Sequence, residues 1–366
     1  MRVEREIAGF AFPFAAGVFA AVLSGSSPCI IKPTYHILAL TFTLSSALLM
    51  LHPARHSWSG RVQWYILLFC TLTCGLTIGM CGIELEISAV STNGWLHQTA
   101  HRAGDGMIRI IDSIQFKDNS TNAVIKALLT GDRSDISSDI SRAFRDSGAS
   151  HILALSGLHL GIIYGIVSKI TSITGNSTDI RRIRSLLIIS ICGLYTLATG
   201  AGASIMRAYV FIVIKEVADM TGRHTSLKGI LAASLAVHLV FCPTAAKDIG
   251  FQLSYAAMFG IAFIFPYLRN MWKNDWKVFK WIWKSSALSI SCQITTGPLA
   301  YFYFRTFPQH FLLTNLLALP LTGITIPAAL LTTIMTSAGW CPKFLTATTE
   351  WLTQVMIEAL KTIATM

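Results

Sequence analysis

Residues 311–335 read FLLTNLLALPLTGITIPAALLTTIM, a run of 25 residues without a charged side chain. A helix of this length is about 37 Å long, which exceeds the hydrocarbon core of a bilayer at about 30 Å. Runs of similar character recur from residue 8 onward, and hydrophobic residues make up 53% of the 366 residues. Charged residues make up only 13%, roughly half the share of an average soluble domain. The sequence therefore predicts an all-α, polytopic integral membrane protein.

The apolar runs predict about 10–11 transmembrane helices and divide the chain into three regions. Residues 1–82 form an N-terminal membrane region of about three spans. Residues 83–150 connect it to the main membrane domain, residues 151–366. The mixed charges before the first run favour a retained span over a cleaved signal peptide. The expected spans are 8–24, 35–51, 63–82, 151–169, 184–199, 204–219, 227–242, 249–268, 285–304, 311–335 and 344–363.

Basic residues mark every second loop between these spans. Because Lys and Arg concentrate in cytoplasmic loops, the N-terminus is expected in the cytoplasm and residues 83–150 outside it. The formal net charge of +11 also raises the question of nucleic acid, but residues 83–150 hold seven Lys/Arg and nine Asp/Glu. The remaining 29 − 7 = 22 basic and 18 − 9 = 9 acidic residues carry the excess. Positive-inside topology accounts for that excess without a nucleic acid.

The connection 83–150 is predicted to form short amphipathic helices outside the membrane. Four apolar residues from Met107 to Ile114 share one helical face, as in a helix that rests on a membrane or on a bundle. A second helix is expected to start near Thr121 and to end at Gly131, because glycine commonly ends helices. A third is expected to be capped by Ser137 or Ser138 and to end at Gly148, after which Ser150 caps the fourth span.

The eight cysteines are scattered and mostly lie inside apolar runs. Neither a CxxC pair nor a Cys/His zinc pattern occurs in the sequence. Free thiols are therefore expected, and no metal or other cofactor.

The fourth span combines small and polar residues at helical spacing. Gly157, Gly161 and Gly165 recur every four residues, a pattern that lets a neighbouring backbone approach closely. His151 lies at the outer end of this span, and on one continuous helix His159 would lie roughly 12 Å deeper. Ser156 and His159 are three residues apart. Polar groups at such depth face protein or water rather than lipid.

Three interpretations of Ser156 and His159 remain open. They have the residue types of a nucleophile and its base, although residues three apart on one helix are poorly placed for proton transfer and no third orienting group is evident. They also suit hydrogen bonds between packed helices. The third interpretation is a polar lining of a hydrophilic path.

Other spans favour the lining. Arg207 follows the glycine-rich run 199–204, where the helix is expected to be interrupted and its backbone to line a cavity. Gln252 and Ser254 follow Asp248, and Asn315 lies one turn into the span 311–335. His151, Arg207, Gln252 and Asn315 are all expected within about two turns of the outer ends of four helices, which predicts an outward-facing vestibule. A guanidinium there suits phosphate, and the alternative for Arg207 is a snorkelling residue at the interface.

Four stretches in this order resemble the ComEC family of competence proteins, the DNA-uptake channels of transformable bacteria. The likeness covers roughly residues 120–335. The stretches are 128–133 with 144–159, GASIMRA at 202–208, DIGFQLSY at 248–255, and PLAYFYF at 298–304 with NLLALPL at 315–321.

The resemblance implies a channel in the bacterial inner membrane that takes one DNA strand into the cytoplasm. As partners it implies single-stranded DNA, membrane lipid, a periplasmic DNA receptor and a cytoplasmic helicase-like motor. Larger members carry an oligonucleotide-binding-like domain and a metallo-β-lactamase-like domain with an HxHxDH motif. Neither is expected here, so we expect a short form without enzyme activity. A separate nuclease and a homo-oligomer stay open, as do transport of another anionic solute and an intramembrane hydrolase.

Overall fold

A computed structural model describes residues 2–23, 68–79, 95–174, 177–200, 202–222, 226–272, 276–305 and 310–365 of the chain. These residues form helices and their connections, and no strand occurs among them, which confirms the all-α class. The described chain divides into two compact units, one of residues 1–92 with 222–255 and one of residues 93–221 with 256–366. The expected span 35–51 lies outside the described residues.

The first unit packs α1 (Arg2–Leu23) against α11 (Leu227–Phe241). It also contains helix Leu68–Gly79, the 3₁₀ helix η3 (Pro243–Lys247) and the start of α12 (Ile249–Phe259). Glycines bring α1 and Leu68–Gly79 close together, because a Cβ on Gly75 would overlap the carbonyl oxygen of Phe14. The core of this unit contains Phe14, Val18, Val22, Leu235, Leu239 and Phe251.

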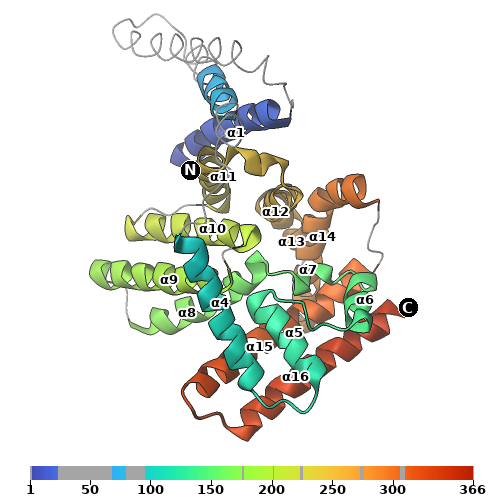
Figure 1. Cartoon of the computed structure of the whole chain (residues 1–366). Helices are drawn as coiled ribbons and strands as arrows, with labels where there is room; N and C mark the ends of the chain where they lie inside the picture. The colour runs from blue at the N-terminus through green and yellow to red at the C-terminus, as the bar shows by residue number, and fades with distance from the viewer. Residues whose placement is uncertain are drawn as a thin grey trace, which may run out of the picture. The chain divides into compact units, whose positions relative to one another are not determined.

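In the second unit, α8 (Gly157–Thr171), α9 (Thr178–Ala198) and α10 (Ala203–Met220) pack on one another as a three-helix layer (Figure 1). The 3₁₀ helix η2 (Ser172–Thr174) follows α8. The interior of the layer is formed by apolar side chains at helical spacing. They are Leu160, Ile163, Ile188, Cys192, Tyr195, Ile205 and Ile212.

The other layer of this unit is built on α15 (Phe311–Ser337), which packs along α16 (Lys343–Ala364) (Figure 1). Against this pair lie α4 (Trp95–Ser113), α5 (Asn119–Thr130) and α6 (Ser138–Asp146). Helix α15 also contacts α8, so it joins the two layers. The core between these helices includes Ile125, Leu128, Phe144, Ala318, Ile326 and Met356.

A long helical segment continues α12 through a π-helical turn, η4 (Gly260–Ile264), into α13 (Phe265–Met271). Helix α14 (Lys277–Phe304) then packs against α13, η4 and α15. Gly260 lets the two backbones meet, because a Cβ there would overlap the carbonyl oxygen of Ser291. A glycine at this π turn therefore allows close packing where the helix is locally widened.

Two helices of the described chain are long and apolar enough to cross a membrane, Ile249–Met271 and Phe311–Ser337. Four shorter apolar helices accompany them: Gly9–Val22, Leu68–Gly79, Gly157–Thr171 and Leu227–Phe241. These helices are compatible with a membrane protein, and the larger number of spans stays a prediction. Apolar side chains also cover the outer side of α9, where Ile183 and Leu194 are 63% and 67% exposed.

The connection before α8 agrees with the sequence at the end of its second predicted helix and the start of its third, and differs after them. Helix α5 ends at Gly131 with φ 84°, and Ser137 caps α6, as predicted. Ser150, however, begins the four-residue helix α7 (Ser150–Leu153) instead of capping the fourth span. The predicted continuous span 151–169 is wrong, because the chain leaves the helical conformation at Ala154 and re-enters it at Gly157.

Candidate functional site

The interruption between α7 and α8 places Ser156 and His159 together at the start of α8. Ser156 is the N-cap of α8, with extended backbone, and its Oγ accepts a hydrogen bond from the Leu158 N–H over 3.3 Å. The His159 side chain turns back, and its Nδ1 accepts from the Ser156 N–H over 3.2 Å. Serine suits this position because its oxygen satisfies one of the free N–H groups at a helix start.

These hydrogen bonds determine which nitrogen of His159 carries the proton. Because Nδ1 accepts from a backbone N–H, the neutral ring is protonated on Nε2. His159 is fully buried, and Nε2 has no hydrogen-bond partner among the described residues. A buried N–H donor without a partner costs about 1–3 kcal/mol, so this ring presents an unused donor inside the second unit.

The contact between Ser156 and His159 is closer than we predicted. Ser156 Oγ lies 3.1 Å from His159 Nδ1, within reach for a nucleophile and its base. The prediction assumed that both residues lie within one helix, whereas Ser156 is the cap outside it. No described side chain hydrogen-bonds Nε2 to orient the ring, as a third catalytic group would.

Helices α8 and α10 run in the same direction, so their N-termini lie at the same end of the layer. A Cβ on Gly157 would lie 3.3 Å from Cβ of Ala208, and further along the Tyr164 hydroxyl donates to Oε1 of Glu216 over 2.9 Å. Arg207 precedes Ala208 in the chain and is only 7% exposed. The structure thus brings the second turn of α10, which carries this arginine, to the start of α8.

The three glycines of α8 differ in their surroundings. Gly157 has the close contact with Ala208 that its residue type predicts. At Gly161 and Gly165, a Cβ would meet no described atom within 4 Å, and both residues are exposed. A packing role for these two therefore stays a prediction that needs a neighbour outside the described chain.

The start of α15, which carries Asn315, is hydrogen-bonded to the turn that precedes His151. His151 is exposed on α7, and its Nδ1 lies 3.1 Å from the Gly148 carbonyl oxygen. The fully buried Thr314, next to Asn315, donates a hydrogen bond to the Ser147 carbonyl oxygen over 2.6 Å. This threonine, which we did not predict, fixes the start of α15 to the turn before α7.

Gln252 and Ser254 belong to the first unit, so the vestibule that we predicted around them and Arg207 stays a prediction. Within that unit, the Gln252 amide donates to the Ala246 carbonyl oxygen over 2.8 Å. Asp248 caps α12 by accepting from the Phe251 N–H over 2.9 Å. Local hydrogen bonds therefore hold this polar stretch.

A buried carboxylate that we also did not predict joins all three helices of the layer. Glu216 on α10 is 2% exposed, and it accepts hydrogen bonds from Tyr164 on α8 and, over 2.7 Å, from Ser185 on α9. Lys215 Nζ lies 3.3 Å from the same carboxylate and 2.8 Å from Asp219. The signal in the sequence was an acidic residue inside an apolar run.

A second buried charge holds the segment outside the expected spans. Lys126 on α5 pairs at 2.6 Å with Asp112 of α4 and with Asp135 of the following loop. Burial would lower the pKa of Lys126, but the hydrogen bonds to the two carboxylates outweigh it and raise that pKa. The hydrogen bond with Lys126 in turn lowers the pKa of Asp135.

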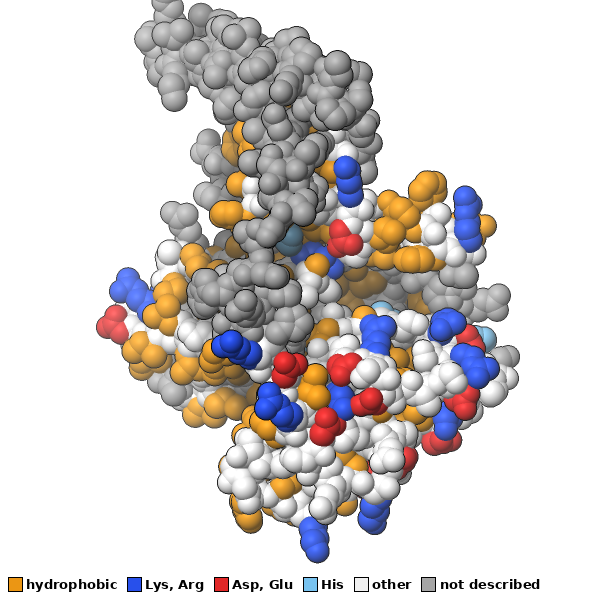
Figure 2. Space-filling view, in the orientation of Figure 1, with side chains coloured by type: hydrophobic (Ala, Val, Ile, Leu, Met, Phe, Trp, Pro, Cys, Tyr) orange, Lys and Arg blue, Asp and Glu red, His pale blue; other side chains and the backbone are white. Residues whose placement is uncertain are grey.

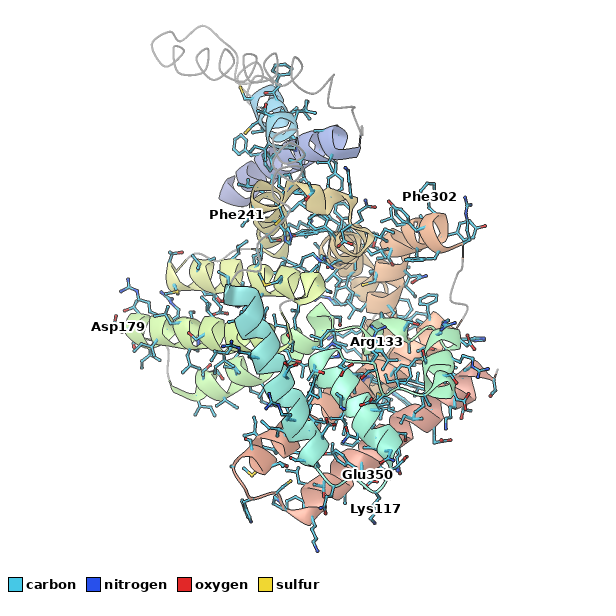
Figure 3. The ribbon with its side chains drawn as sticks, viewed as in Figure 1. Lys117, Arg133, Asp179, Phe241, Phe302 and Glu350 are labelled. Carbon is cyan, nitrogen blue, oxygen red and sulfur yellow. The ribbon has the colours of Figure 1, made fainter. Side chains whose placement is uncertain are left out.

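Two further hydrogen bonds connect this segment to its neighbours. The Arg133 guanidinium donates through Nε to the Leu153 carbonyl oxygen over 3.2 Å, and Glu350 of α16 accepts from the Asp118 N–H over 3.1 Å (Figure 3). They tie the loop after α5 to α7 and the start of α5 to α16. In the described chain no three His, Cys, Asp or Glu residues are grouped as metal ligands, and the six described cysteines are free.

Comparison with known proteins gives these residues a family. The family model for "Competence protein" matches residues 128–366. The chain is 24% identical over 207 residues to ComE operon protein 3 of Bacillus subtilis, across 57% of this chain and 24% of that protein. It is 26% identical over 226 residues to the uncharacterized protein YcaI of Escherichia coli, across 60% of this chain and 30% of that protein.

The chain thus spans less than a third of the length of either relative, and no solved structure matches it. The family match begins inside α5 and includes α7, the interruption, α8 and Arg207. It covers more than half of the chain. The chain belongs to the ComEC family of competence proteins.

Proposed function

We propose that this chain forms an inner-membrane channel that passes single-stranded DNA into the cytoplasm during natural transformation. Its membership of a competence family supports a role in DNA uptake. The finer proposal rests on one observation, the interruption of the helix at 154–156 beside the start of α10. Within a membrane, irregular backbone is tolerated only where it is buried in protein or lines a water-filled cavity.

The polar groups at this interruption suit the passage of a polyanion. The N-terminus of a helix carries a partial positive charge, and here α8 and α10 start at the same end of the layer. Arg207 adds a full positive charge, and the planar guanidinium group that carries it can donate to two phosphate oxygens at once. The DNA strand must also leave the channel, and a dense basic pore would retain it. A few dispersed donors such as Arg207 and His159 therefore serve its passage better.

The proposed path also includes residues at other helix ends. His151, Ser156, Gln252, Ser254 and Asn315 are the side chains that we expect to contribute polar partners. A periplasmic DNA receptor, a cytoplasmic helicase-like motor and a separate nuclease would supply capture, driving force and strand degradation. We place none of these activities in this chain, whose proposed role is conduction.

A transformation assay tests the proposal. Deletion of the gene should abolish transformation while DNA binding at the cell surface persists. Complementation with Arg207→Ala should lower transformation about 10- to 100-fold, as expected when one charged hydrogen-bond donor is lost. Lys343→Ala, which removes an exposed charge at the start of α16, is the matched control and should restore it fully. Equal effects of the two variants at equal protein levels would refute the proposed path.

The contact between Ser156 Oγ and His159 favours one alternative function, an intramembrane hydrolase. Ser156→Asn separates the two functions. Asparagine keeps the N-cap hydrogen bond but has no nucleophilic hydroxyl. A channel should keep near-normal transformation with this variant, whereas a hydrolase should lose its activity completely.

A further inference from the structure

Aromatic residues concentrate at the corner between α13 and α14. Four of the nine tryptophans of the chain lie within residues 272–283. Most large apolar side chains here are exposed, among them Trp276 at 79% and Trp281 at 49%. The described residues on either side of 273–275 therefore expose apolar rings at this corner.

Three lysines form a stripe on the first two turns of α14. At 100° per residue, Lys277, Lys280 and Lys284 fall within about 60° of one another, and Trp281 lies beside this arc, about 40° from Lys277. All three are exposed, and no described acidic side chain pairs with any of them. Among the described residues, the stripe is therefore a positive charge without an acidic partner, and it lies beside one tryptophan.

The opposite side of α14 packs against α13, which turns the lysine stripe outward. Trp272 lies 5.3 Å from Phe279 and 5.6 Å from Trp283 between ring centroids. The Trp283 indole N–H donates to the Leu268 carbonyl oxygen over 3.0 Å. These contacts hold the first turns of α14 against the end of α13, so the stripe is a fixed feature of the surface of α14.

The topology that we predict from the basic loops places this corner at the cytoplasmic side of the membrane. It follows directly on Ile249–Met271, one of the two described helices that could cross a membrane. Tryptophans gather at the level of the lipid head groups, where an apolar ring and a polar N–H are both satisfied. Lysines just beyond the end of a span are attracted to the anionic lipids of the cytoplasmic leaflet.

We propose that Lys277, Lys280 and Lys284 bind the head groups of anionic phospholipids while Trp281 inserts among them. The corner then anchors α14, and with it the adjoining α15, at the cytoplasmic surface of the membrane. This proposal does not depend on the transport of DNA. A transformation assay that refutes the DNA path would leave the lipid site intact, and a lipid titration that refutes the lipid site would leave the DNA path intact.

Lipid titration of the purified, full-length chain in detergent tests the proposal. Phosphatidylglycerol should raise the midpoint of thermal unfolding more than phosphatidylcholine does. A basic residue near an anionic surface strengthens binding about fivefold, so Lys277→Gln, Lys280→Gln and Lys284→Gln together should raise the phosphatidylglycerol concentration for half the effect about 100-fold. The response to phosphatidylcholine should not change, which also shows that the variant is folded.

The matched control replaces three exposed basic residues outside the expected spans, Lys117, Arg142 and Arg145, by glutamine. It should keep the wild-type response to phosphatidylglycerol. A wild-type response in the α14 triple variant would overturn the proposal. Binding of single-stranded oligothymidylate gives a second way to overturn it. If the triple variant loses that binding but keeps its response to phosphatidylglycerol, the stripe binds nucleic acid and not lipid.

Fluorescence quenching tests the insertion of Trp281. With brominated phosphatidylglycerol, Trp281→Phe should reduce the quenching of tryptophan fluorescence, and unchanged quenching would contradict the insertion.

Discussion

The layer of α8, α9 and α10 and the segment of α4, α5 and α6 each bury apolar side chains and one charge, but they differ in the side chains on their outer surfaces. In the layer, the charged Glu216 is inside while Ile183 and Leu194 of α9 are mostly exposed. In the segment, Leu128 and Phe144 are buried, and acidic and basic side chains mix over the surface of α4 and α5 (Figure 2). The same chain thus contains a bundle suited to lipid and a set of helices suited to water.

The difference also shows what a buried charge does in each place. In the layer, Glu216 receives donors from three helices and holds together surfaces that lipid could otherwise separate. In the segment, apolar burial already drives association, and Lys126 selects one arrangement of α4, α5 and the following loop. If this contrast is correct, removal of the two charges should have unequal effects.

The largest effect is expected for Glu216→Ala. The change leaves the hydroxyls of Tyr164 and Ser185 without their shared acceptor, and each such loss costs about 1–3 kcal/mol, while the half-exposed Lys215 keeps its pair with Asp219. Thermal unfolding of the purified protein in detergent measures it. Glu358→Ala, in an exposed pair with Lys361, is the control and should change stability by at most about 1 kcal/mol. Equal stabilities of Glu216→Ala and Glu358→Ala would mean that the buried carboxylate does not hold the layer together.

A smaller effect is expected for Lys126→Met, which keeps much of the side-chain volume. About 1–2 kcal/mol should be lost, because Asp112 and Asp135 are half exposed and water partly screens their attraction to the lysine. Local unfolding of α5, followed by amide hydrogen exchange, is the direct measurement. Exchange at the wild-type rate would mean that apolar packing alone holds the segment.

The same ion pairs predict how the segment responds to acid. The folded-state pKa of Asp135 is lowered by Lys126, so its contribution is present above the ordinary carboxyl pKa of about 4. That contribution should disappear as the pH falls through the lowered pKa. The difference between wild type and Lys126→Met should therefore be constant from pH 7 to about pH 5 and vanish in stronger acid. A difference that grows in acid would contradict this origin.

Local signals explain which parts could be predicted from the sequence. Gly131 and Ser137 determine helix ends through their own backbone and side chain, and both were predicted correctly. The interruption at 154–156 was missed because Ala154 and Leu155 continue the apolar run without a proline or an early glycine. The capping role of Ser156 could nevertheless have been predicted, because serine is a preferred N-cap residue.

The polar contacts of the site depend on residues far apart in the chain, which a sequence pattern does not bring together. Glu216 meets Tyr164 and Ser185 across 52 and 31 residues. Thr314 meets Ser147 across 167 residues. Residue type indicated that polar groups in apolar runs need partners, but only the packing of the helices shows which partners they have.

The smallest effect concerns one glycine from each region. Gly106 in α4 and Gly161 in α8 are both inside helices, and a Cβ at either would meet no described atom within 4 Å. Alanine favours a helix by about 0.5–1 kcal/mol over glycine, so Gly106→Ala and Gly161→Ala should each stabilise the protein by that amount if both faces are open. Thermal unfolding in detergent compares them. If Gly161→Ala instead lowers stability or transformation while Gly106→Ala does neither, another surface packs on α8 at Gly161, as its spacing with Gly157 and Gly165 predicts.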